Sequence, residues 1–113
     1  MARILSTGVK PTPQFVKMPN VEITSTTAGD SNKSYFVNTS AGAVQLTLPA
    51  GPSMGDIVRI FDAANTFDTY NLTVARNGNP IMGANDDLVV TTEGAAFELV
   101  YYNSTQGWRI FTI

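Results

Sequence analysis

The sequence of 113 residues contains neither cysteine nor histidine. Without cysteine the chain cannot form a disulfide, a thiolate metal site or a cysteine nucleophile. Without histidine it lacks the commonest general base and the commonest ligand of transition metals. We therefore predict that the protein is not an enzyme and that it uses no cofactor.

Charged residues are also scarce. They make up 14% of the chain, against about 25% in an average globular domain. Threonine, asparagine, serine and glycine take their place, and these residues favour turns and strand faces over helix interiors. The net charge is −2 and the sequence pI is near 4.8. The seven basic residues are scattered along the chain, so we expect no nucleic-acid partner.

Long apolar runs are missing as well. No segment is apolar and long enough to span a bilayer as a helix, so we expect no membrane partner. The first eight residues lack the sustained apolar core of a signal peptide. We therefore expect that the protein is not exported by the general secretory route.

Residues 1–32 are predicted to form an extended N-terminal arm. Apolar residues are sparse there, and Pro11, Pro13 and Pro19 disfavour a helix or a central strand. Gln14–Lys17 and Val21–Ser25 have the composition of short extended pieces, and Thr24–Asn32 that of a flexible loop. Because the arm is too weakly apolar to fold alone, we expect it to lie on a partner or on its own domain.

Residues 33–113 have the pattern of a β domain. Val44, Leu46 and Leu48 alternate with polar residues, which is the period of a half-buried strand. Turn signals, among them Asn77-Gly78, recur at roughly the 8–12-residue spacing of sandwiches and barrels. We predict an all-β fold, an antiparallel β-sandwich or barrel-like domain of about eight strands with almost no helix.

The acidic residues allow two site hypotheses. Asp86 and Asp87, with Asn85 beside them, offer the oxygen ligands of a calcium-type cation, but an ordinary polar loop accounts for them better. A glycosidase needs two carboxylates on opposite sides of a cleft, and five acidic residues are candidates for such a pair. The candidates are Asp62, Asp68, Asp86, Asp87 and Glu98. Solvated surface carboxylates are the favoured interpretation, so we assign no catalytic and no metal residues.

Aromatic residues at alternating strand positions point either to the core or to a subunit interface. We expect Phe61, Phe97 and Trp108 in the core. Tyr35, Tyr101 and Tyr102 are candidates for an interface. Together with arm residues they make up the predicted partner-binding set, which is Pro11, Pro13, Phe15, Val16, Met18, Tyr35, Tyr101 and Tyr102.

Several short motifs, taken in order, resemble a β-domain that recurs in virion proteins of tailed bacteriophages. They are Tyr35–Pro49, Gly55–Val58, Asn71–Val74, Asn77–Ile81 and Gly107–Arg109. The resemblance covers about residues 33–113. It implies a virion structural protein, assembled in the cytoplasm of the bacterial host and frequently a homotrimer.

Within that resemblance two roles compete. Because only a short arm follows Met1 before the domain, we expect a capsid decoration (cement) protein. Such a protein binds and stabilises the head shell, and its arm contacts neighbouring subunits of the major capsid protein. The alternative is a tail or neck fibre subunit whose β-domain mediates appendage assembly or receptor binding.

Overall fold

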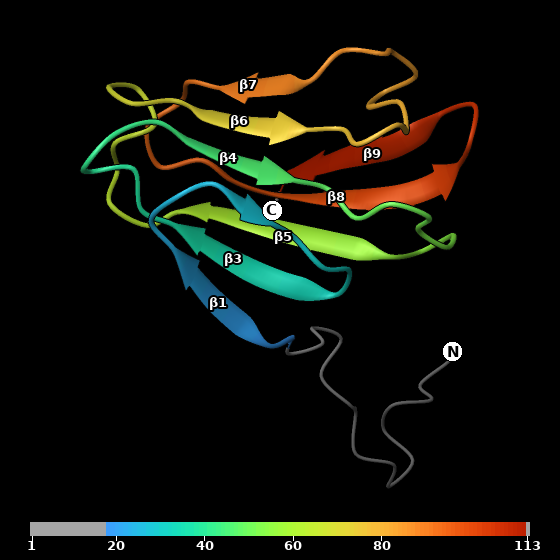
Figure 1. Cartoon of the computed structure of the whole chain (residues 1–113), viewed down its shortest axis with the longest axis horizontal. Coiled ribbons are helices and arrows are strands. Elements are labelled where there is room, and N and C mark those ends of the chain that lie inside the picture. The colour runs from blue at the N-terminus through green and yellow to red at the C-terminus, as the bar shows by residue number, and fades with distance from the viewer. Residues whose placement is uncertain (1–17, 113) are drawn as a thin grey trace, which may run out of the picture.

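The computed structural model describes residues 18–112, and this part of the chain forms nine strands and no helix (Figure 1). The strands are β1 (Asn20–Ile23), β2 (Thr27–Ala28), β3 (Lys33–Val37), β4 (Val44–Thr47), β5 (Ile57–Asp62), β6 (Leu72–Ala75), β7 (Leu88–Val90), β8 (Ala96–Asn103) and β9 (Gly107–Thr112). Over the same range, no helix has the length and apolar character needed to cross a membrane. The all-β prediction is confirmed.

The strands form two mixed sheets, of order β1-β3-β5-β8-β9 and β2-β4-β6-β7. From β1 to β6 the chain alternates between the sheets, so β1, β3 and β5 are parallel neighbours, as are β2, β4 and β6. The pairs β5–β8, β8–β9 and β6–β7 are antiparallel. The prediction of an antiparallel domain is therefore wrong for the pairing among the first six strands. Their turns are arches between sheets, whereas antiparallel neighbours are usually joined by hairpins within one sheet.

The folded part begins before Lys33, which corrects the predicted boundary of the arm. β1 pairs with β3 and forms one edge of the five-stranded sheet, while β2 pairs with β4 in the other sheet. Met18 and Ile23 are buried. Residues 20–28 therefore belong to the folded domain and not to the expected arm and loop. A local sequence pattern cannot predict this, because it depends on parallel pairing with other strands.

One hydrophobic core lies between the two sheets. Val37, Ile60 and Leu99 from the larger sheet and Leu46 and Val74 from the smaller sheet are fully buried in it. The alternation seen in the sequence places these side chains on the inner faces, as expected for layered sheets. Phe97 and Trp108 belong to this core, as predicted.

The predicted core position of Phe61 is wrong. Phe61 follows Ile60 on β5, and successive residues of a strand point to opposite faces of the sheet. Ile60 occupies the core, so Phe61 lies half-buried on the outer face and stacks on Phe36, with 4.7 Å between ring centroids. The large aromatic side chain that fills the core nearby is Phe67, in the loop after β5, where strand alternation gives no signal.

Gly107, at the start of β9, lies against the loop that follows β6. Its φ is 68°, and a Cβ atom there would lie 1.8 Å from the carbonyl oxygen of Pro80. The next residue, Trp108, donates its backbone N–H to the same oxygen at 2.8 Å. Only glycine allows this approach, which holds the loop onto the edge of β9.

We expect Gly107→Ala to lower the free energy of unfolding by at least roughly 3 kcal/mol, because the new methyl group collides with backbone. Gly51→Ala is the matched control. Gly51 has a similar φ of 62° but no atom within 4 Å of the Cβ position, so only the left-handed conformation is penalised, by about 1–2 kcal/mol. Urea denaturation measures both losses, and equal losses would contradict the close approach.

Candidate interaction surfaces

Asp62, one of the candidate catalytic acids, organises two loops. Its Oδ1 accepts the backbone N–H of Thr66 at 3.1 Å, and its Oδ2 accepts those of Phe67 at 3.1 Å and Gly94 at 3.0 Å. The carboxylate is buried at the end of β5. It therefore fixes the loop after β5 to the turn between β7 and β8, and its hydrogen-bonding capacity is engaged there.

Glu98, a second candidate acid, forms a buried ion pair with Arg59. Nε and Nη2 of Arg59 each lie 2.7 Å from Oε2 of Glu98, and both side chains are almost fully buried. The register places the two residues opposite one another on β5 and β8. Because an uncompensated charge at such a site costs several kcal/mol, each residue requires the other.

Asp86 and Asp87 lie in the loop between β6 and β7. Asp87 accepts the backbone N–H of Arg76 through Oδ1 at 2.9 Å, so it closes the base of this loop. Asn77, with φ 49°, and Gly78, with φ 91°, form the tight turn predicted there. Between residues 18 and 112 there is no group of three or more acidic, cysteine or histidine side chains that could hold a metal ion.

Two of the predicted interface tyrosines belong to the interior. Tyr35 is buried in the core, and its hydroxyl oxygen accepts the backbone N–H of Asp30 at 2.6 Å. The Asp30 carboxylate in turn binds Lys33 Nζ at 3.0 Å, and this hydrogen bond raises the pKa of Lys33. Tyr101 packs edge-on against Trp108 and donates its hydroxyl to Asn79. Tyr35 and Tyr101 are therefore corrected to core residues.

Tyr102 lies on the surface, as its predicted role requires. It belongs to what we call the outer aromatic face, the solvent side of the five-stranded sheet that carries Phe36, Phe61, Tyr102 and Phe111. Phe36, Tyr102 and Phe111 are 37%, 50% and 57% exposed. The register places the Arg59–Glu98 pair between the Phe36–Phe61 stack and Phe111, so the centre of this face has little net charge.

Phe36 and Phe111 were not predicted to lie on a surface. A sequence signal for their surface position did exist. Each follows another apolar residue, Tyr35 or Ile110, and only one of two successive strand residues can face the core. Of the predicted arm residues, Met18 is buried. Pro11, Pro13, Phe15 and Val16 lie outside the described residues.

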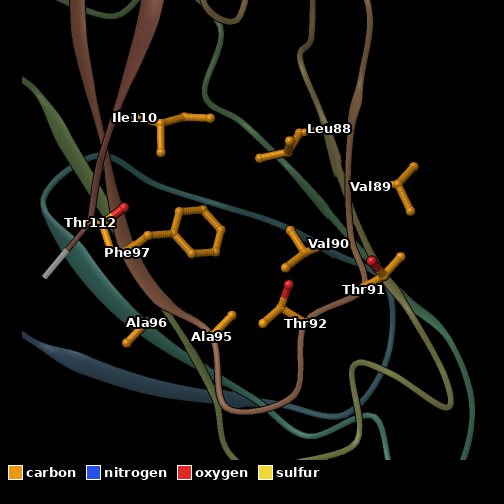
Figure 2. A pocket seen from close by; sticks show the side chains of 10 residues that line it. All are labelled: Leu88, Val89, Val90, Thr91, Thr92, Ala95, Ala96, Phe97, Ile110 and Thr112. Carbon is orange, nitrogen blue, oxygen red and sulfur yellow. The ribbon is translucent and has the colours of Figure 1, made fainter.

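A second surface feature is the groove between β7 and β9, which we call the edge groove (Figure 2). It has a volume of about 360 Å³ and lies where the two sheets separate at their last strands. Its lining contains no charged residue. The lining residues are Leu88, Val89, Val90, Thr91, Thr92, Ala95, Ala96, Phe97, Ile110 and Thr112.

No protein-family profile matches the chain. One similar protein is the baseplate wedge protein gp10 of Enterobacteria phage T4, which is 32% identical over 89 residues. The match covers 75% of this chain and 15% of that protein, so the chain spans about a seventh of its length. This distant homology relates the chain to a phage virion structural protein, in agreement with the resemblance seen in the sequence.

We expect Asp62→Asn to lower the free energy of unfolding by roughly 2–4 kcal/mol, because an amide nitrogen would face backbone N–H donors in a buried site. Asp68→Asn is the control, since Asp68 is exposed in the same loop, and should change stability by no more than about 0.5 kcal/mol. Thermal and urea unfolding measure both variants. Unchanged stability of Asp62→Asn would argue against the loop-anchoring role.

Proposed function

We propose that this chain is a non-enzymatic structural subunit of a phage tail, an assembly module of a baseplate or of a tail or neck appendage. Its partners are other virion proteins and further copies of itself, as a homotrimer. The observation that carries the proposal is the match of three quarters of the chain to a baseplate wedge protein. The capsid decoration role has less support, because that relative is a baseplate protein.

The outer aromatic face suits a protein that works by contact. Exposed aromatic side chains around a neutralised arginine are the composition typical of the core of a protein interface. Phe111 and Tyr102 offer large apolar areas. The Arg59–Glu98 pair is already desolvated in the chain alone, so covering it requires little further loss of hydration.

The candidate carboxylates support a structural role in a direct way. Asp62 holds two loops, Asp87 closes a third, and Glu98 neutralises Arg59. Three of the five acids considered for catalysis are thus bound into the architecture. A general acid or base must instead reach the proton that it transfers to or from the substrate.

The number of copies per particle distinguishes a tail subunit from a decoration protein. We expect quantitative mass spectrometry of purified virions to find tens of copies or fewer per particle, and gold labelling to mark the tail. The major capsid protein, counted in the same sample, is the internal standard. Hundreds of copies, with label spread over the head, would overturn the tail assignment in favour of decoration.

The outer aromatic face is tested by incorporation into particles. We expect the double variant Tyr102→Ser, Phe111→Ser to fold normally but to enter virions at least tenfold less than the native chain. Tyr70→Ser is the control, because Tyr70 is also exposed, at 44%, but lies in the loop between β5 and β6. Native levels of the double variant in purified particles would exclude this face as the contact.

A further inference from the structure

The two edge strands beside the edge groove have unused pairing capacity. Within the described residues the strand neighbour of β7 is β6 and that of β9 is β8, so each has one edge without a neighbouring strand, and that edge of β9 carries a single bridge from Trp108 to Ile81. At the start of β9, the amide and carbonyl of Trp108 point away from β8 and bind Pro80 and Met82. Strand alternation makes Ile110 and Thr112 point their amides and carbonyls the same way, and of these groups the Ile110 amide is bound to Met82 Sδ at 3.3 Å. A further strand here would find main-chain partners at the Ile110 carbonyl and at Thr112, beyond the groups that Pro80 and Met82 already bind.

The side chains of the edge groove suit a strand as well. In Figure 2, Leu88, Val90 and Phe97 point into the groove from its two walls, while Val89 points away. Apolar pockets between two free strand edges are the elements of β-strand addition, in which backbone bonds give affinity and alternate side chains fill pockets. A helix could not use the edges, because its backbone groups are already bonded.

The chain itself supplies a candidate for this strand. Residues 1–17 precede the described part, and Gln14–Lys17 is the stretch whose composition predicts an extended piece, with Phe15 and Val16 as its apolar residues. This stretch joins Met18 beside β1. In the five-stranded sheet β1 and β9 are opposite edges, four strand spacings or roughly 19 Å apart.

The opposite positions of β1 and the edge groove favour exchange between copies. When copies stand side by side with β1 of one next to β9 of the next, each segment begins close to its neighbour's groove. Such a contact joins two different surfaces, and it closes into a ring when the rotation allows. Each copy then gives one segment and receives one, so the contacts reinforce each other through the ring.

We propose that Gln14–Lys17 of one copy adds as a strand in the edge groove of a neighbouring copy, between β7 and β9. The inference deepens the proposed self-association and rests on it for the presence of several copies. The sequence left two places open for this segment, a partner or its own domain, and the proposal places it on a partner.

Disulfide trapping tests the exchange cleanly, because the native chain has no cysteine. We would combine Val16→Cys with Val90→Cys and, separately, with Ile110→Cys in the full-length protein. Mild oxidation should give at least tenfold more covalent multimers for these pairs than for Val16→Cys combined with Met54→Cys. Met54 is 72% exposed and lies in the loop between β4 and β5, away from the groove.

Gel mobility without reductant separates the outcomes. Species of two or more chains that exceed those of Val16→Cys alone support exchange between copies. A disulfide within one chain, identified by peptide mapping, would place the segment on its own domain and overturn the proposal. Equal multimer yields from the groove pairs and the Met54 pair would overturn it too.

A second measurement uses neighbouring residues on opposite faces of β9. Ile110 packs towards the core side and lines the groove, whereas Phe111 belongs to the outer aromatic face. In the Val16→Cys, Val90→Cys background, Ile110→Lys should reduce trapped multimers at least fivefold and Phe111→Lys should not. Unfolding curves verify that both variants fold. Trapping is read on purified protein, so its result is independent of whether virions incorporate the chain.

Discussion

The fold depends on the burial of two sheet faces against each other by a chain that changes sheet at almost every turn. No single sheet here could be stable alone, since its apolar face would meet water. The inner residues of both sheets therefore form one core. Because β1 to β6 alternate between the layers, each arch must hold its two strands at the separation of the sheets, which places unusual demands on the connections.

Those demands explain where the few charged side chains are used. Asp62 binds three backbone amides from the β5–β6 and β7–β8 connections, which both cross between the sheets, whereas Asp87 binds one amide in the β6–β7 connection within the smaller sheet. A carboxylate accepts several N–H groups at once and does so more strongly than a neutral oxygen. In a chain with only nine acidic residues, a single carboxylate such as that of Asp62 is an efficient way to order two arches that hairpin ladders cannot order.

The sequence predicted the all-β class and about eight strands but not their pairing. Alternation located β4 at Val44–Thr47, and turn residues located the tight turn at Asn77-Gly78, because both signals are local. The parallel pairs were missed because a turn of the same composition serves a hairpin or an arch equally well. The interior tyrosines, Tyr35 and Tyr101, were misassigned because alternation shows which residues share a face but not which face meets solvent.

The surfaces left by this topology follow from the same constraint. A sheet of five strands packed on one of four leaves an outer face, where Phe36, Phe61 and Phe111 lie, and an open side at β7 and β9. The face presents exposed aromatic side chains, and the open side presents strand edges without a further strand. The two therefore select for different contacts: an aromatic face recognises another packed surface, whereas a free edge recognises an extended chain. In the assembly role that we propose, these two surfaces would serve two kinds of neighbour, a packed surface and an extended chain.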